Sequence, residues 1–133
     1  MNFKELEKVL QKSWSRETSY IPEEWGASNL AIGQCAVTAL VVNDYLGGDM
    51  VWAEVILPDG QKVSHYFNFI NGKEVDFTRS QFPEDTQIPK GVEKKKDFTT
   101  PREFLLSNDN TRKRYELLKE RVKNNFTFKI EIF

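Results

Sequence analysis

The stretch "AIGQCAVTALVVNDYLGG", residues 31 to 48, decides how the rest of the chain is interpreted. It places the only cysteine of the chain, Cys35, directly after Gly-Gln and at the head of an Ala- and Val-rich run. The run is apolar on most sides and stops at Gly47-Gly48, a pair typical of a helix C-terminus. We therefore predict a buried helix over residues 34–46 with Cys35 in its first turn.

The segments around this helix carry the patterns of both helices and strands. Apolar residues at steps of three and four predict an amphipathic helix at 2–15. Thr100-Pro101 has the composition of a helix start, and a further helix is predicted at 111–123. Alternating or β-branched runs predict four strands, at 50–57, 61–70, 73–78 and 126–133.

The order of these elements predicts the fold class. The two middle strands are joined by Asn71-Gly72, a strong hairpin signal, so the centre of the chain is an antiparallel meander. The irregular segment before Cys35 and the long loop 79–97 interrupt the pattern without dividing it. We predict one α+β domain, residues 1–133, with helices packed on an antiparallel sheet of about four strands.

Composition excludes several classes of function. Nineteen basic and twenty acidic side chains give a net charge of -1, without the basic excess of a nucleic-acid-binding protein. No apolar run approaches the length of a membrane helix or of a signal peptide, so we expect a cytoplasmic protein without membrane contact. One cysteine and one histidine cannot provide a structural zinc site. We expect no metal and no cofactor, and the sequence does not indicate the oligomeric state.

Three residues form a candidate site in chain order: Cys35, His65 and Asp76. If Asn71-Gly72 is a two-residue turn, His65 and Asp76 project from the same face as diagonal neighbours, about 7–8 Å apart at the backbone. A three-residue loop would place them on opposite faces. The two-residue turn therefore predicts that the carboxylate of Asp76 holds one nitrogen of the imidazole.

These residue types suit nucleophilic catalysis. The start of a helix favours the thiolate form of a cysteine, because unpaired backbone N–H groups point toward it. A histidine accepts the thiol proton and returns it to the leaving group, while a carboxylate orients the ring. The backbone N–H of Cys35 is placed to stabilise an oxyanion. Gln34, Asn29 and the tryptophans before Cys35 are candidates for the second donor.

The motifs "GQCAVTALVVNDYLGG", "SHYFN" and "GKEVDFTRSQF" resemble the small bacterial YunG-like proteins, over about residues 25 to 82. Such proteins resemble compact members of the papain-like and transglutaminase-like cysteine superfamily. That resemblance implies a papain-like (transglutaminase-like) cysteine fold, with Cys35 as nucleophile, His65 as base and Asp76 as orienting acid. The sequence differs from papain-like proteases in one respect. In those proteases the glutamine that donates to the oxyanion lies several residues before the cysteine. This chain has Asn29 at the more distant position, and its Gln34 is directly adjacent to Cys35.

We expect a thiol hydrolase or acyltransferase that acts on an amide or isopeptide bond of a peptide or small amide. Substrate-binding candidates are Gln34, Asn29, Trp25 and Trp14. Large aromatic residues are more often core, and His65 is alternatively a satisfied core histidine. Glu74 is an alternative to Asp76. Two other functions stay open: a non-catalytic binding module on the same scaffold, and a redox-sensing thiol that needs no Asp76.

Overall fold

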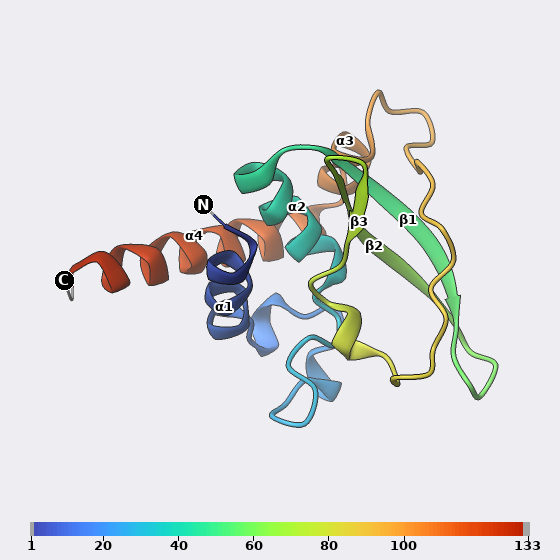
Figure 1. The fold of residues 1–133 in the computed structure, drawn as a ribbon, viewed down its shortest axis with the longest axis horizontal. Coiled ribbons are helices and arrows are strands. Elements are labelled where there is room, and N and C mark those ends of the chain that lie inside the picture. Colours follow the sequence, from blue (N-terminus) through green and yellow to red (C-terminus); the bar gives the residue numbers. More distant parts are fainter. Residues whose placement is uncertain (1, 132–133) are drawn as a thin grey trace.

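The computed structural model describes the backbone of residues 2–131 and the side chains of residues 2–126. It is an α+β structure in which helices pack on a three-stranded antiparallel sheet within these residues (Figure 1). The helices and strands are α1 (Phe3–Ser13), α2 (Cys35–Leu46), β1 (Asp49–Ile56), β2 (Lys62–Ile70), β3 (Lys73–Val75), α3 (Pro101–Leu106) and α4 (Asp109–Glu131). Short 3₁₀ turns lie at Arg16–Thr18, Pro22–Glu24 and Arg79–Gln81.

Helix α2 is the centre of the molecule, with the sheet on one side and α1 and α4 on the other (Figure 1). It is apolar on most sides up to Val42, and residues 37–42 are all buried. A stretch of helix with so little polar surface has to be enclosed by other elements, which explains this central position. It ends at Gly47, whose φ of 71° places it in the left-handed region that glycine tolerates.

The β2–β3 hairpin forms with the predicted turn. Asn71 and Gly72 both have positive φ, 53° and 79°, as a two-residue type I′ turn requires. Ile70 then pairs with Lys73, which confirms the expected register. The third strand is shorter than predicted, because it ends at Val75 rather than at residue 78.

The predicted C-terminal strand, residues 126–133, is wrong for residues 126–131, which continue helix α4. Residues 132 and 133 lie outside the described residues. No glycine or proline occurs between 109 and 131, so nothing in the sequence stops a helix that has already been nucleated. The alternation of apolar residues in this segment indicated a strand, but propagation of the helix prevails. In Figure 1 the end of α4 extends away from the body of the molecule.

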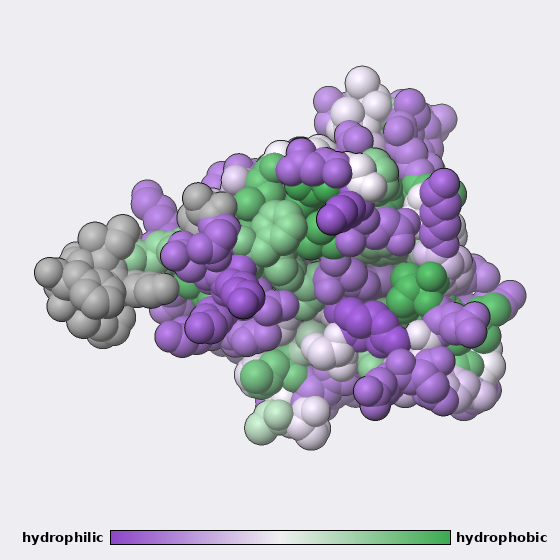
Figure 2. Space-filling model, viewed as in Figure 1, coloured by the Kyte–Doolittle hydropathy of each residue, from purple (hydrophilic) through white to green (hydrophobic). Residues whose placement is uncertain are grey.

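The other predicted helices are confirmed, with small shifts of their ends except for α4, which continues to Glu131. Thr100 caps α3 by accepting a hydrogen bond from the N–H of Glu103, with Pro101 at the first helical position. Helix α1 begins after Asn2, whose side chain accepts from the N–H of Glu5. On the face shown in Figure 2, apolar side chains gather between α1 and the sheet, framed by polar ones.

The long loop before α3 lies along the outer edge of β1. Val92 forms a β-bridge with Trp52 through two backbone hydrogen bonds of 2.8 Å. The ammonium of Lys94 lies 4.1 Å from the ring centre of Trp52. This loop covers an edge that would otherwise expose unpaired backbone groups. In the described part of the chain, no helix is both long and apolar enough to cross a membrane.

Candidate active site

Cys35 is the first residue of α2, and its thiol is half-buried rather than enclosed in the core. Its Sγ lies 3.9 Å from the carbonyl oxygen of Ser64, so it faces strand β2 next to His65. At the start of a helix the first backbone N–H groups have no partner within the helix and are free to donate to a bound group. The helix therefore places the sulfur where a nucleophile could reach a bound substrate.

His65 is completely buried, between two aromatic rings. It stacks on Phe67 at a centroid distance of 5.2 Å and meets the edge of Phe82 at 4.9 Å. Its Nε2 lies 2.6 Å from Oδ2 of Asp76. The aromatic walls fix the plane of the ring, and the carboxylate fixes which nitrogen points away from it.

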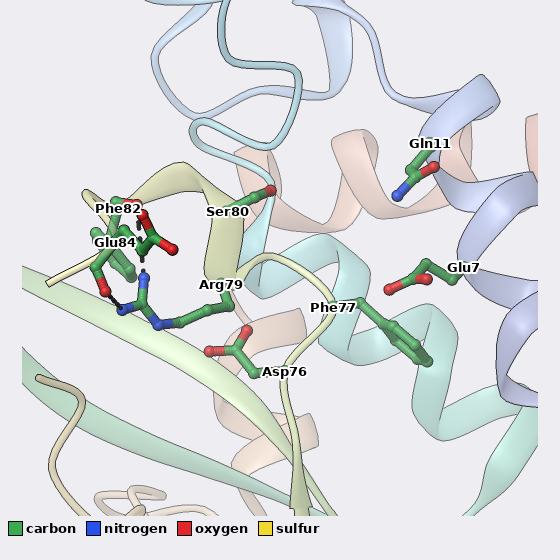
Figure 3. Close-up of a pocket in the computed structure, with 8 residues that line it drawn as sticks. All are labelled: Glu7, Gln11, Asp76, Phe77, Arg79, Ser80, Phe82 and Glu84. Carbon is green, nitrogen blue, oxygen red and sulfur yellow. Dashed lines mark hydrogen bonds between the residues drawn. The ribbon is translucent and has the colours of Figure 1, made fainter. Parts of the chain in front are cut away.

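Asp76 follows the last residue of β3. Its Oδ1 accepts a hydrogen bond from the N–H of Thr78 at 3.2 Å, which leaves Oδ2 for the imidazole. The alternative carboxylate, Glu74, instead accepts from the N–H of Gly91. Arg79 does not pair with Asp76 either, because its guanidinium binds backbone carbonyls of residues 82–86 (Figure 3).

The far side of Asp76 borders a hollow of about 630 Å³, opposite Glu7 and Gln11 of α1 (Figure 3). Of the three candidate catalytic residues, Asp76 alone lines this hollow. The thiol lies in a different cleft, so the larger hollow is not where an acyl group would meet Cys35.

His65 interacts with the charges of both other candidate residues. Burial alone would lower the pKa of His65, but its hydrogen bond to Asp76 and the negative charges of Cys35 and Asp76 outweigh burial and raise that pKa to about 9. Each ring nitrogen carries one proton or one lone pair. Since Asp76 occupies Nε2, Nδ1 is the ring nitrogen that remains for other partners.

Cys35 opens into a cleft of about 470 Å³. Its walls come from the segment before α2, from β2, from the 3₁₀ turn at 79–81 and from α3 and α4. The polar side chains that line it include those of Tyr20, Lys62, Tyr66, Gln81, Thr111 and Arg114. No aspartate or glutamate among the described residues lines this cleft.

Gly33, two residues before α2, lies where this part of the chain crosses the segment at residues 19–20. Its φ is +74°, and a Cβ there would lie 2.2 Å from Oγ of Ser19 and 2.8 Å from the backbone nitrogen of Tyr20. The backbone N–H of Tyr20 donates to the carbonyl of Gly33 at 2.9 Å. Glycine is therefore required where two chain segments cross, and the crossing brings Tyr20 to the rim of the cleft.

Gln34 and Asn29 do not face the cleft as the sequence suggested. The side chain of Gln34 is fully buried, and it donates to the carbonyl of Ser15 and accepts from the hydroxyl of Thr18. Asn29 donates to the backbone carbonyl of Gln81. Both amides hold the polypeptide in place, because the segment before α2 is irregular and its backbone groups need partners.

The two tryptophans are also structural. Trp14 belongs to the hydrophobic core, and its indole N–H donates to Oγ1 of Thr38 inside α2. The indole N–H of Trp25 donates to the carbonyl of Leu30 and closes the loop between them. Neither ring lines the Cys35 cleft.

Gln81 is a site residue that the sequence did not single out. Its Nε2 lies 3.4 Å from Nδ1 of His65 and 3.2 Å from Oγ1 of Thr78. Gln81 therefore lies beside the ring nitrogen that Asp76 does not occupy. The sequence does place Gln81 five residues after Asp76, within the motif "GKEVDFTRSQF" that resembles the YunG-like proteins.

Two further cleft residues were also missed. The hydroxyl of Tyr66 forms no hydrogen bond within residues 2–126, and burial, followed by the charge of Cys35, raises its pKa to about 12. Arg114 is 8% exposed in spite of its charge. It follows Thr111 by three residues and precedes Leu118 by four, so helical spacing places it on the buried stripe of α4. No metal-binding cluster occurs among the described His, Cys, Asp and Glu residues.

The fold and the site define an α+β protein with a Cys–His–Asp arrangement between a buried helix and an antiparallel sheet. The family model "YunG protein" matches residues 2–127, and the chain therefore belongs to this family. The "Uncharacterized protein YunG" of Bacillus subtilis (strain 168) is 39% identical over 74 residues. That match spans 56% of this chain and 57% of the relative, so little more than half of each is compared. No solved structure matches this chain.

Proposed function

We propose that this chain is a thiol hydrolase or acyltransferase that acts on an amide or isopeptide bond of a peptide or small amide. The observation that supports this most directly is His65, whose Nε2 lies 2.6 Å from Oδ2 of Asp76 and whose pKa is raised by the charge of Cys35 as well. A histidine that only filled the core would need neither of these charges beside it. The papain-like or transglutaminase-like ancestry belongs to the same proposal and is supported by the order of the three residues.

The reaction has two half-reactions. In the first, the Cys35 thiolate attacks the acyl carbon, an oxyanion forms, and the C–N bond breaks as the imidazolium of His65 gives its proton to the leaving amine. In the second, His65 takes a proton from water, which attacks the thioester and releases the acid and the thiol. An amine in place of water gives acyl transfer. Asp76 holds the ring and stabilises its positive charge throughout.

The structure offers a donor for the oxyanion in place of Gln34. The backbone N–H of Cys35 is the first, and the hydroxyl of Tyr66 is the second in this proposal. The hydroxyl lies in the same cleft, close enough for the charge of Cys35 to affect its ionisation, and has no competing partner among the described residues. Its raised pKa keeps the proton on the oxygen, as a donor requires.

The proposal is tested with p-nitrophenyl acetate, which transfers an acetyl group to Cys35 and reports it by release of nitrophenolate. At pH 7 we expect acetylation at least tenfold faster than that of N-acetylcysteine, and loss of the signal in Cys35→Ala. Asp76→Asn should slow acetylation about 10-fold or more, whereas Glu74→Gln should not, since Glu74 binds Gly91 instead. Acetylation no faster than the free thiol in the folded wild type would overturn the proposal.

The same variants separate the alternatives. A redox-sensing thiol needs an accessible cysteine but no geometry for acyl transfer, so Asp76→Asn would leave both its reaction with hydrogen peroxide and its acetylation rate unchanged. A non-catalytic binding module would acetylate no faster than N-acetylcysteine in every variant. The half-buried position of Cys35 and its charge interaction with His65 favour the acyl-transfer function over both.

A further inference from the structure

Arg114 is a buried cation without a buried anion. Its side chain projects from α4 into the wall of the Cys35 cleft and is 8% exposed. Burying a guanidinium is costly unless a charged partner or several hydrogen bonds compensate for the lost water. None of the aspartates and glutamates of residues 2–126 forms an ion pair with it.

The hydrogen bonds of Arg114 leave part of the guanidinium free. Nε donates to Oδ1 of Asn110 at 2.8 Å, one terminal nitrogen donates to the carbonyl of Thr18 at 3.2 Å, and the other lies 3.5 Å from Oγ1 of Thr111. All three acceptors are neutral. A guanidinium has five N–H groups, so one remains on each terminal nitrogen. The neighbouring groups orient the side chain without neutralising it.

The electrostatics of the cleft agree with this geometry. Burial lowers the pKa of Arg114, and the negative charges of Cys35 and then of Tyr20 act in the opposite direction, so the guanidinium lies within electrostatic range of the thiol. Lys62 lines the same cleft, but it is exposed to solvent and pairs with Glu54 at 3.9 Å. Arg114 is therefore the cation of the described lining that has no carboxylate partner, and its charge favours an anion in this cleft.

We propose that the Cys35 cleft selects substrates that carry a carboxylate near the scissile acyl group, and that Arg114 binds this carboxylate. This inference rests on the proposed acyl-transfer function and specifies its substrate class. The planar fork of a guanidinium matches the two oxygens of a carboxylate, and its charge is unpaired until the substrate arrives. The ring of Tyr20, with its centre 5.5 Å from the Cζ of Arg114, covers the guanidinium at the rim of the cleft.

The first test compares two alkylating reagents that differ in charge, iodoacetate and iodoacetamide. We expect the ratio of their rates with Cys35 to exceed the ratio for N-acetylcysteine, and to fall about tenfold in Arg114→Gln. Arg114→Lys, which keeps the charge, should retain most of the preference. The matched control is Arg112→Gln, which removes the same charge from an exposed position on the same helix and should leave the ratio unchanged.

Arg114→Gln also removes the hydrogen bond to Thr18, so its folding is checked by circular dichroism. The second test avoids this problem because it uses the wild-type protein. Succinate should slow alkylation by iodoacetamide in a saturable way, whereas its neutral analogue succinamide should not. Equal effects of the two compounds would overturn the inference. Stronger protection by inorganic phosphate than by succinate would overturn the assignment of a carboxylate.

The two proposals fail in different ways. If p-nitrophenyl acetate does not acetylate Cys35 faster than N-acetylcysteine, the acyl-transfer function is wrong. If acetylation is fast but iodoacetate shows no preference and succinate gives no protection, the function stands and the carboxylate specificity is wrong.

Discussion

Nε2 of His65 lies 2.6 Å from Oδ2 of Asp76, with the histidine side chain fully buried and the aspartate side chain 16% exposed. The asymmetry matters because water reaches the acid but not the base. Burial disfavours the charged form of the His65 ring, and the hydrogen bond and charge of Asp76 compensate for that cost. Asp76 therefore sets the protonation of His65 from the edge of the sheet.

The first prediction concerns the titration of His65, which is the only histidine of the chain and gives a single imidazole signal in NMR. We expect a midpoint near the raised pKa of about 9 rather than 6.5. Asp76→Asn should lower the midpoint by one unit or more, since its hydrogen bond and charge are removed. Glu74→Gln, the control on the same hairpin, should not move it, and a wild-type midpoint at or below 6.5 would contradict the proposed ion pair.

The raised pKa of His65 also gives the protein a pH-dependent stability. The folded state binds this proton more tightly than the unfolded chain, where the pKa is 6.5. The stabilisation is therefore complete below pH 6.5 and is lost as the pH rises through about 9, by at most about 3 kcal/mol. Urea unfolding should show a larger difference between wild type and Asp76→Asn at pH 6 than at pH 10. An equal difference at both values would mean that Asp76 stabilises the fold independently of His65.

The second prediction separates nucleophile reactivity from oxyanion stabilisation. Tyr66→Phe removes one hydroxyl that has no hydrogen bond within the described side chains. Acetylation by p-nitrophenyl acetate passes through an oxyanion and should slow about 10²-fold, whereas alkylation by iodoacetamide has no oxyanion and should change less than about twofold. If both rates fall together, Tyr66 acts on the thiol itself and not on the acyl oxygen.

The third prediction tests the structural role of Gln34. Gln34→Met keeps the volume of the side chain but removes its hydrogen bonds to Ser15 and Thr18. The free energy of unfolding should fall by about 1–3 kcal/mol in urea titrations. Acetylation of the folded variant should stay within about twofold of wild type, and Gln87→Met, at an exposed loop position, should change neither quantity. Unchanged stability with a large loss of acetylation would instead make Gln34 an oxyanion donor.

Local rules were sufficient to predict the His65–Asp76 contact. The Asn71-Gly72 turn fixes the register of the hairpin, and register fixes which side chains share a face. Similarly, the Gly47 stop and the Thr100 cap define helix ends through backbone chemistry that involves neighbouring residues alone. These features depend on short stretches of chain.

The remaining site residues depend on contacts between distant segments. Arg114 is separated from Thr18 by most of the chain, and no local pattern shows that α4 packs against the segment before α2. A charged side chain is usually solvated, and the helical spacing of Arg114 with Leu118 agrees with the buried face that the structure shows. The strand predicted at 126–133 was wrong for the opposite reason. The local alternation of apolar residues was given more weight than the continuity of the helix that precedes it.

The last prediction concerns the contacts that hold the wall of the cleft. Asp44 of α2 accepts a hydrogen bond of 2.5 Å from the hydroxyl of Tyr115 and forms an ion pair of 2.7 Å with Arg102. These three residues join α2, α3 and α4, and the last two helices carry the cleft residues Leu105 and Arg114.

Asp44→Asn should therefore lower the free energy of unfolding by about 1–3 kcal/mol, since the amide keeps one acceptor and turns a donor toward its former partners. Glu116→Gln removes a carboxylate from an exposed pair with Arg112, at 3.9 Å, and should cost less than about 0.5 kcal/mol. Both are measured by urea unfolding at pH 7. Because the contacts of Asp44 with Tyr115 and Arg102 fix the helix that carries Arg114, Asp44→Asn should also reduce the iodoacetate preference of Cys35 in the folded protein. Equal losses of stability in Asp44→Asn and Glu116→Gln would show that these contacts contribute no more than a surface ion pair.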